Sequence, residues 1–334
     1  MSAVIKNRLL YQMLIPVVSF SSDMGNIVSQ IKKGIQNPSL AMSVLKNDLL
    51  KIQSRITRTL FSRNDPPIPE RDWDNCLILD AARYDLFKKH NTLSGNLDVS
   101  YSIAASTAEY LRKTFKNKEY PDIVCVTSQP KYRKEFVENS FHEVIHVWKN
   151  DWDQEYRMVL PEIMNRRVLE TIEKFPNKRI LAHYIPPHGP YIGETGQQMP
   201  PHRIHLGSDL NDENKEKPWL KDLIIDGEVT KEEYKRAYEE NMEIAISGIK
   251  EIVADLPGKT VVTADHGQAF GHLSEFGVVG HPSNLHIRPL IEVPWLVNHS
   301  GNRKDLESGD IADNQIDISD SVVQERLEDL GYVE

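Results

Sequence analysis

The stretch Lys259-Thr-Val-Val-Thr-Ala-Asp-His-Gly267 decides the fold prediction for this chain. Its first half, Thr260 to Thr263, is short, apolar and β-branched, as expected of a fully buried strand. Asp265 and His266 follow at or just past the strand's C-terminal end, where open α/β sheets bind ligands. Gly267 then allows a sharp turn, so that both side chains can face one point. An adjacent carboxylate and imidazole suit a divalent metal such as Zn²⁺ or Mn²⁺, although a strand that ends in a polar turn has the same pattern.

Strand-like and helix-like runs alternate on both sides of this stretch. Trp73 to Asp80 predicts a strand that ends in an acid, and Ser106 and Thr107 lie where a loop enters a helix. Further strand-like runs are 122–127, 143–148, 179–185 and 290–297, and the helical runs are 108–115, 161–175, 232–256 and a short one that ends at Gly331. This alternation predicts an α/β fold, a three-layer sandwich in which helices cover both faces of a largely parallel central sheet.

The N-terminal residues 1–64 are predicted to form a separate helical extension. Apolar residues recur there at the spacing of one helical face: Leu45, Leu49, Ile52 and Ile56. Lysines and arginines lie mostly on the other face, which suits solvent or a peripheral contact with acidic lipid. The proline-rich linker Asn64–Pro69 marks the boundary. We therefore predict one large α/β domain over residues 65–334.

Composition narrows the classes of function. The chain has 334 residues, a net charge of −9 and a pI of about 5.8, which argue against nucleic acid as its main partner. Its only cysteines, Cys76 and Cys125, lie in apolar runs and are predicted to be buried thiols rather than a disulfide framework. Leu9 to Phe20 is shorter than the roughly 18 apolar residues of a membrane span, and no signal cleavage motif follows it. We expect it to pack on the main domain or lie in a membrane interface, in a cytoplasmic protein that is free or membrane-associated.

Residues 189–231 interrupt the alternation of strands and helices. They are rich in Gly, Pro, Asn, Asp and Lys, as is typical of a long surface insertion. Long loops in compact domains are usually functional or disordered. Because this one begins beside a group of histidines, we predict a lid-like insertion over the active site.

Three points of the predicted sheet carry matching chemistry. Asp80 ends one strand, Thr107 follows a loop, and Asp265 with His266 ends a late strand. In a parallel sheet all of them lie at the same edge, where two carboxylates, an imidazole and a hydroxyl would surround a metal. The metal would lower the pKa of the hydroxyl and hold it as a nucleophile. Thr107 also stands at the head of a helix, which favours an anion, although an N-cap hydroxyl would have the same position.

The ordered set of motifs resembles the alkaline phosphatase superfamily, in its sulfatase-like and phosphodiesterase-like branch. The resemblance is carried by 77–85, 106–107, 182–190, 263–267, 280–281 and 293–294. It implies that Asp80, Asp265 and His266 bind the principal metal and that Thr107 is both ligand and nucleophile. It also implies a hydrolase or transferase acting on a phosphate mono- or diester, with one or two ions of Zn or Mn, or of Mg or Ca. The partner would be a phosphorylated or sulfated small molecule, glycan or lipid head group.

The chain departs from the family's patterns at two places. Ser106 to Tyr110 lacks the arginine of the motif that sulfatases mature to formylglycine, and neither cysteine has that context, so a sulfate ester is the alternative substrate. Tyr184 stands where two-zinc members have an aspartate four residues before His188, and His183 is either a substitute ligand or a strand histidine. His188-Gly-Pro-Tyr191 is similar to the central motif of phosphoethanolamine and lipoteichoic acid transferases, which implies that His188 contacts the phosphate or the leaving group.

Other residues receive smaller roles. His281 has the spacing of the family's later histidine or lysine, which implies a second-metal ligand or a donor to the substrate's anionic oxygens. Arg83 and Asp85 are predicted to form a local ion pair. The remaining candidates are expected to be surface or lid histidines: His202, His205, His272 and His286. Should the metal ligands be incomplete, the alternative is a non-catalytic member that binds an anionic glycan or lipid head group.

Overall fold

The computed structural model describes residues 50–52, 54, 65–132, 137, 139–202, 218–311, 323, 325–327 and 330. The chain divides into two compact units, one of residues 1–63 with 285–287 and one of residues 64–284 with 288–334. The predicted helical extension, including Leu9 to Phe20, lies almost wholly outside the described residues, so its helices and its lipid contact stay predictions. All the strands and helices below belong to the second unit.

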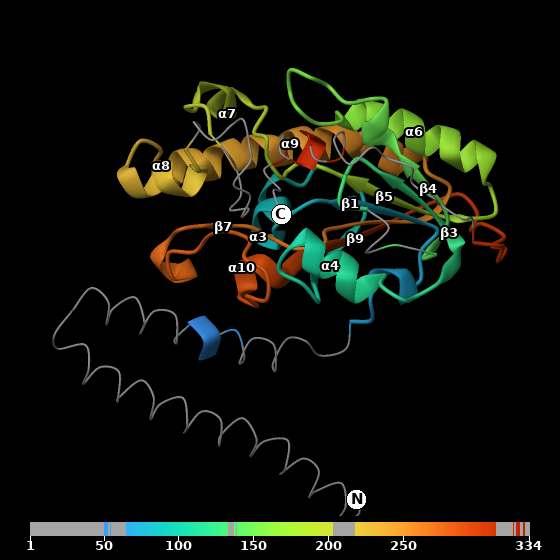
Figure 1. The fold of residues 1–334 in the computed structure, drawn as a ribbon. Coiled ribbons are helices and arrows are strands. Elements are labelled where there is room, and N and C mark those ends of the chain that lie inside the picture. The colour runs from blue at the N-terminus through green and yellow to red at the C-terminus, as the bar shows by residue number, and fades with distance from the viewer. Residues whose placement is uncertain are drawn as a thin grey trace, which may run out of the picture. The chain divides into compact units, whose positions relative to one another are not determined.

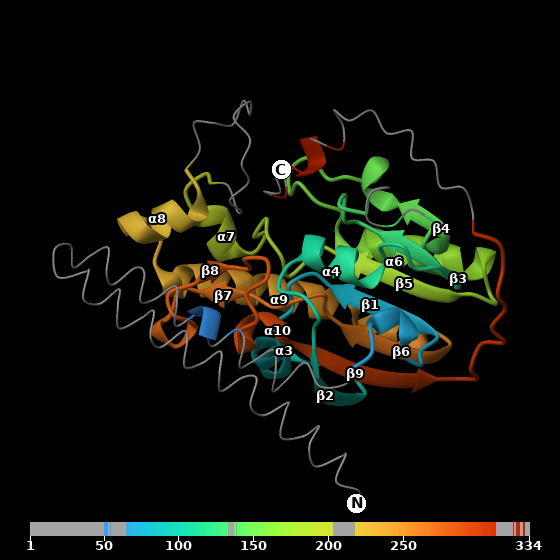
Figure 2. The ribbon, with the colours of Figure 1, turned by 60° about the horizontal axis from the view of Figure 1, so that its bottom comes forward.

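A seven-stranded sheet in the order β2-β9-β6-β1-β5-β3-β4 forms the centre of this unit (Figures 1 and 2). The strands are β1 (Asn75–Leu79), β2 (Asn96–Tyr101), β3 (Tyr120–Thr127), β4 (Phe141–His146), β5 (Arg179–Tyr184), β6 (Gly258–Thr263) and β9 (Glu292–Ser300). Pairs β1–β5, β1–β6, β3–β4 and β3–β5 are parallel, and only β9 runs antiparallel, against both β2 and β6. The largely parallel sheet is confirmed, and a separate two-stranded ribbon joins β7 (Ala269–Phe270) to β8 (Val279–Gly280).

Helices cover both faces of the sheet, which confirms the three-layer sandwich (Figures 1 and 2). On one face lie α3 (Tyr84–His90), α6 (Pro161–Lys174) and α9 (Lys231–Asp255), and on the other lies α4 (Thr107–Thr114). The short elements are α7 (Glu194–Gln198), α8 (Leu220–Asp226), α10 (Arg288–Ile291) and the 3-10 turns 68–70, 147–149 and 273–275. None of the described helices is both long and apolar enough to cross a membrane.

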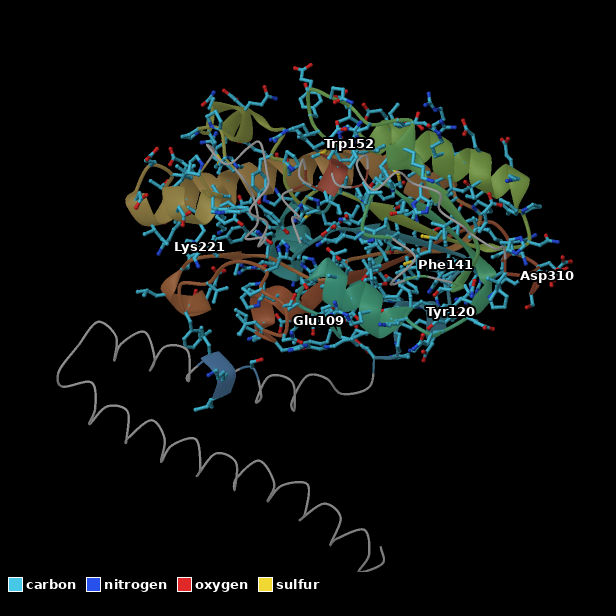
Figure 3. All side chains as sticks on the ribbon, viewed as in Figure 1. Glu109, Tyr120, Phe141, Trp152, Lys221 and Asp310 are labelled. Carbon is cyan, nitrogen blue, oxygen red and sulfur yellow. The ribbon has the colours of Figure 1, made fainter. Side chains whose placement is uncertain are left out.

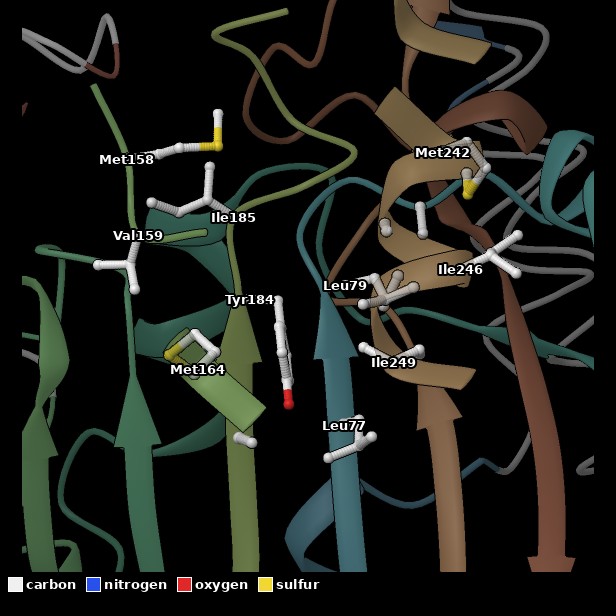
Figure 4. Packing of buried hydrophobic residues seen from close by; sticks show 14 of the residues in the cluster. Leu77, Leu79, Met158, Val159, Met164, Tyr184, Ile185, Met242, Ile246 and Ile249 are labelled. Carbon is white, nitrogen blue, oxygen red and sulfur yellow. The ribbon is translucent and has the colours of Figure 1, made fainter. Parts of the chain in front are cut away.

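The alternation of side chains along β1 and β5 sorts the core into two clusters. Leu77 and Leu79 pack with the α6 and α9 side, whereas Ile78 packs with the α4 side, since successive strand residues point to opposite faces. Tyr184 of β5 lies with Leu77 and Leu79, as Figure 4 shows. His183, its neighbour in the strand, therefore belongs to the α4 face, which is the face that carries the site. Cys76 and Cys125 are buried free thiols, as predicted.

An aromatic cluster fills the space between the sheet and α4. Phe115 follows α4, and its ring centroid lies 6.1 Å from Tyr120, 6.1 Å from Tyr132 and 4.8 Å from Phe141; Tyr120 and Phe141 are labelled in Figure 3. The Tyr132 ring in turn meets the His183 ring edge-on at 5.5 Å. Edge-to-face packing of this kind holds rings in defined orientations. The apolar core on this face is thereby continuous with the polar groups at the edge of the sheet.

The predicted lid-like insertion, 189–231, is described only at its two ends. Residues 189–202 include α7, and residues 218–231 include α8 and the start of α9. At α7, Thr195 donates from its backbone N–H to Glu240 of α9 at 2.7 Å. α9 begins with a capping box in which the Thr230 hydroxyl accepts from Glu233 N–H at 3.1 Å and Glu233 accepts from Thr230 N–H at 2.7 Å. The middle of the insertion lies outside the described residues, and its role as a lid stays a prediction.

Candidate active site

The predicted acid, hydroxyl and Asp-His residues meet at the C-terminal edge of the sheet. Asp80 follows β1, Asp265 and His266 follow β6, and all three are fully buried. The Thr107 hydroxyl lies 3.1 Å from His266 Nε2 and 3.4 Å from each carboxylate oxygen of Asp80. His266 Nε2 is 3.5 Å from Asp80 Oδ1 and 3.4 Å from Asp265 Oδ2. Residues far apart in the chain thus form one compact polar cluster, because parallel strands bring their carboxyl ends together.

Thr107 is the first residue of α4, and it does not cap that helix. The N-cap is Ser106, whose extended backbone lets its side chain accept from Glu109 N–H at 3.5 Å. The N-cap explanation for the Thr107 hydroxyl is therefore wrong. Since Ser106 serves the helix end, the Thr107 hydroxyl is directed at Asp80 and His266 instead. Its place at a helix N-terminus also favours an incoming anion.

Two backbone N–H groups orient the Asp265 carboxylate. Its Oδ1 accepts from Ala81 N–H at 3.1 Å and from His266 N–H at 3.0 Å. Its Oδ2 is buried and has no hydrogen-bond partner among the described residues. Ala81 has a φ of 61°, a conformation that costs free energy for a residue with a Cβ, and the Tyr238 hydroxyl holds it by donating to its carbonyl at 2.7 Å. The backbone is strained at the point where it aims a donor at Asp265.

Gly267 is required for a different reason from the one predicted. Its φ is not in the left-handed region, but a Cβ there would come within 2.2 Å of the Pro289 carbonyl oxygen. Its N–H donates to the Leu290 carbonyl at 2.7 Å. The missing side chain allows the segment before β9 to pass directly beside the Asp-His pair, so close approach rather than a sharp turn explains the glycine.

Two loop residues that sequence reasoning missed complete the cluster on its other side. Gln129, just after β3, donates from Nε2 to Asp80 Oδ2 at 2.7 Å. Tyr132 places its hydroxyl 3.0 Å from Nδ1 of His183. His183 is fully buried, with Nε2 3.7 Å from Asp80 Oδ2 and 4.0 Å from Asp265 Oδ2. In the sequence, the only indication that Gln129 belongs to the site is that it follows a strand which ends at the same edge of the sheet.

Three histidine rings lie in a row beside Thr107. Ring centroids are 4.5 Å apart for His266 and His281, and 5.1 Å apart for His281 and His188. In each ring Nδ1 faces an oxygen that only accepts: Gly267 O at 2.9 Å for His266, Gly189 O at 2.6 Å for His188 and Gln268 Oε1 at 2.7 Å for His281. Nδ1 therefore carries the hydrogen in each, and in the neutral ring Nε2 carries the lone pair. Gln268, also missed from the sequence, is itself held by the Tyr234 hydroxyl.

The remaining candidates lie outside this cluster. Tyr184 points to the opposite face of the sheet (Figure 4). There its hydroxyl donates to Asn165 Oδ1 of α6 at 2.9 Å, so the position of the second-zinc aspartate faces the core. The Arg83–Asp85 ion pair is confirmed at 2.6 Å, and Arg83 also pairs with Glu275. His202 and His272 are half-buried, His286 is buried rather than exposed, and His205 lies outside the described residues.

Burial controls the protonation of the cluster. It raises the pKa of Asp80 well above the usual range, and the neighbouring Asp265 charge raises it further. Burial opposes ionisation of Asp265 as well, but its histidine neighbours and the donors on Oδ1 bring its pKa below the usual value. Burial lowers the pKa of His266, and it lowers the pKa of His183 to about 4. The raised pKa of Asp80 favours its protonated form, and the lowered pKa values of His266 and His183 favour neutral rings.

The donor set fits a divalent metal ion. Asp80, Asp265 and His266 each offer one ligand atom, and these atoms lie within 4.8 Å of one another. Four ligands placed about 2.0 to 2.2 Å from one ion lie about 3.3 to 3.6 Å apart, which matches the separations of 3.4 and 3.5 Å seen from His266 Nε2. The buried Asp265 Oδ2 without a hydrogen-bond partner is the kind of atom that an ion satisfies.

No protein-family model matches the chain, and no curated protein matches it. Solved structures do show similarity. The C-terminal periplasmic domain of a phosphoethanolamine transferase from Campylobacter jejuni has a TM-score of 0.44 and 13% identity, over 67% of this chain and 78% of that chain. The soluble domain of lipooligosaccharide phosphoethanolamine transferase A from Neisseria meningitidis has a TM-score of 0.46 and 16% identity, over 70% and 79%. A lipoteichoic acid synthase from Listeria monocytogenes has a TM-score of 0.40 and 13% identity, over 84% and 78%.

Proposed function

We propose that this protein is a metal-dependent enzyme that transfers or hydrolyses a phosphate ester through a Thr107 nucleophile. The observation that carries the proposal is the place of the Thr107 hydroxyl, 3.1 Å from His266 Nε2 and 3.4 Å from Asp80 in a buried cluster. Because Ser106 caps the helix, the hydroxyl has no structural task at the start of α4. A hydroxyl that is buried among carboxylates and neutral imidazoles is placed for chemistry.

Asp80, Asp265 and His266 would hold the divalent ion, with Thr107 as a further oxygen ligand. A set of two carboxylates and one imidazole suits Zn²⁺ or Mn²⁺. Bound there, the ion would lower the pKa of the Thr107 hydroxyl and stabilise negative charge on the substrate oxygens. The protonation of the apo cluster agrees with this role, because the proton on Asp80 can be exchanged for a cation.

Thr107 would act in two half-reactions. In the first, Thr107 gives its hydroxyl proton to the solvent, Oγ1 forms a bond to phosphorus, the ester P–O bond breaks, and the departing oxygen takes one proton from the solvent. In the second, water or an acceptor alcohol attacks phosphorus, the bond to Oγ1 breaks, and Thr107 regains its hydroxyl proton. His188 and His281, in the row of rings that begins at His266, would donate from Nε2 to the phosphoryl oxygens and the leaving group when that nitrogen is protonated, since in the neutral ring Nε2 carries a lone pair.

The substrate we propose is a phosphorylated small molecule, glycan or lipid head group. The motif His188-Gly-Pro-Tyr191, similar to that of head-group transferases, supports an anionic head group. A sulfate ester is less well supported, because Cys76 and Cys125 are fully buried within β1 and β3 and neither can serve as a formylglycine precursor at the site.

The test is replacement of Thr107 by Ala in protein supplied with Zn²⁺ or Mn²⁺. Turnover of an aryl phosphate should fall by at least about 10³-fold, since the nucleophile is gone. Thr114→Ala is the matched control, because Thr114 is a fully buried threonine of the same helix and lies outside the site. Mass spectrometry of rapidly quenched wild-type protein should find one phosphoryl group on the Thr107 peptide. Equal turnover by the two variants would rule out the nucleophile.

A further inference from the structure

Glu109, the third residue of α4, has no place in the function described so far (Figure 3). We infer that its buried carboxylate holds the loop 281–284, which carries His281, against the start of the helix that carries Thr107. This role rests on the proposed function, because the placing of His281 beside Thr107 is what gives the link a consequence for turnover. Glu109 would act through His281, and it is therefore a positioning residue.

The same sequence pattern begins two helices and is used differently in each. Thr230 and Glu233 begin α9, and Ser106 and Glu109 begin α4, each with the hydroxyl and the glutamate of a capping box. In α9 the glutamate is exposed and accepts from the N–H of Thr230 at 2.7 Å. In α4 the glutamate is only 2% exposed, and its oxygens bind donors other than the N–H of the cap. Glu109 is thus diverted from the usual task of its position.

One oxygen of Glu109 joins two segments that are far apart in the chain. Its Oε2 accepts from Ala105 N–H at 3.0 Å and from Asn284 N–H at 2.9 Å. Ala105 leads into the cap of α4, and Asn284 lies three residues after His281. Asn284 has a φ of 63°, a conformation that asparagine tolerates. Because both donors bind the same atom, the His281 loop is fixed relative to the start of α4.

A pair of hydroxyl groups makes a second link between the same two segments. The Ser106 hydroxyl, which caps α4, lies 2.7 Å from the hydroxyl of Ser283. On the side of the site, the His281 ring centroid is 4.5 Å from that of His266, whose Nε2 lies 3.1 Å from the Thr107 hydroxyl. A shift of this loop would therefore move the His281 ring relative to the proposed nucleophile.

Glu109 is ionised although it is buried. Burial opposes ionisation of its carboxyl, but Lys113 and the two backbone N–H groups bring its pKa below the usual value. Lys113 pairs with the other oxygen, Oε1, and its side chain is 37% exposed against 2% for Glu109. Hydrogen bonds to an ionised acceptor are roughly twice as strong as those between neutral groups. The buried charge therefore makes a firmer link between the two segments than a neutral acceptor would.

The test is a double-mutant cycle on the turnover of an aryl phosphate by the full chain supplied with Zn²⁺ or Mn²⁺. Glu109→Ala should lower kcat by about 10- to 100-fold, the size of effect that a misplacement of about 1 Å can have. In a His281→Ala background the same change should lower kcat by less than about 3-fold, since the group that it positions is already gone. Glu109→Gln keeps an oxygen for the two N–H donors and should lie between Glu109→Ala and the wild type.

Glu233→Ala is the matched control, at the same position of α9. It removes a capping-box glutamate from the exposed end of a helix, and it should lower the unfolding temperature without a change in kcat. Zinc affinity, measured by competition with a chromophoric chelator, should be unchanged in Glu109→Ala and in Glu233→Ala. The reason is that the proposed metal ligands Asp80, Asp265 and His266 follow β1 and β6 rather than the linked loop.

Each outcome bears on one claim. No loss of kcat in Glu109→Ala, or an equal loss in the two backgrounds, would overturn the positioning role and leave the proposed function intact. A loss of zinc affinity as large as the loss of kcat would overturn it as well. Wild-type protein without turnover in either metal would overturn the proposed function, and the positioning role with it. If Glu109→Ala does not fold, Glu109→Gln is taken through the same cycle, and equal losses in the two backgrounds would then refute the role.

Discussion

Two buried aspartates flank β1, one at the N-terminal edge of the sheet and one at the C-terminal edge, and their surroundings differ. Asp74 precedes the strand, and its Oδ2 accepts from Lys259 N–H at 2.6 Å and pairs with the guanidinium of Arg303. Asp80 follows the strand and lies against a second carboxylate, Asp265, and against neutral imidazoles. The protein supplies its own cation at the first edge. At the second edge it gathers carboxylates that repel one another, an arrangement that is stable only with a proton or an added cation.

Of the variants at the two ends of β1, the largest effect is expected at Asp265. Asp265→Asn keeps an oxygen for the two backbone donors on Oδ1, but it removes the charge that faces the ion. We expect zinc affinity to fall by more than about 100-fold, above the range seen when only an outer partner is lost. Unfolding in chelator should be no easier than for the wild type, since a buried charge has gone while an oxygen for both backbone donors is kept. Chelator competition and thermal unfolding measure the two effects.

Asp74→Asn is the matched control at the other edge. It should leave zinc affinity unchanged and lower stability, because the Arg303 guanidinium loses its buried partner. A fall in zinc affinity for Asp74→Asn as large as that for Asp265→Asn would show that the two edges do not differ in the way described.

The acidic pair also predicts a pH dependence of the chelated protein. The pKa of Asp80 is raised in the folded state by burial and by Asp265, so the folded state holds a proton that the unfolded state releases. This contribution to stability is complete below about pH 4 and is lost as the pH rises through the raised pKa, by at most about 1.4 kcal/mol per pH unit. Urea unfolding from about pH 5 to about pH 8 should therefore show the wild type losing stability relative to Asp80→Asn. Parallel curves would contradict the raised pKa of Asp80.

At the opposite edge, removing the cation should affect stability alone. Arg303 pairs with Asp74 and donates from Nη2 to Asp72 at 2.7 Å, while its side chain remains 44% exposed. Arg303→Met should lower the free energy of unfolding by about 1 to 2 kcal/mol, since solvent already weakens the pair. Zinc affinity should not change. A urea midpoint equal to that of the wild type would mean that Asp74 needs no guanidinium.

The smallest effect is expected at Tyr184. Tyr184→Phe removes the hydrogen bond to Asn165 Oδ1 within the core and should cost about 0.5 to 1.5 kcal/mol of stability. Because the side chain faces α6, the variant should bind zinc as the wild type does. Weaker zinc binding by Tyr184→Phe would place this side chain in the metal centre and contradict the face assigned to it.

The strands that carry the site could be predicted from the sequence, because their apolar runs and the acids that follow them are local patterns. The β-branched run before Asp265 and the apolar run before Asp80 each end in an acid, and both strands are parallel as expected. The ends of elements were less predictable: β9 was expected over 290–297 and occupies Glu292–Ser300. Its antiparallel direction is set by pairing with β2 and β6, which no local pattern records.

Residues that orient the site could not be predicted in the same way. β5 is buried on both faces, so hydrophobicity alone did not show which of His183 and Tyr184 faces the site. Gln129, Tyr132 and Gln268 lie in loops, and only tertiary contacts bring their side chains to Asp80, His183 and His281. The choice between Ser106 and Thr107 as N-cap also depended on one backbone angle.

The central claim is that the buried acidic cluster at this edge is completed by a divalent ion. The most direct measurement is the metal content per chain, by elemental analysis of protein purified without chelators and of protein supplied with Zn²⁺ or Mn²⁺. We expect one tightly held ion per chain, absent from Asp265→Asn. Wild-type protein that holds no ion after both metals are supplied would contradict it.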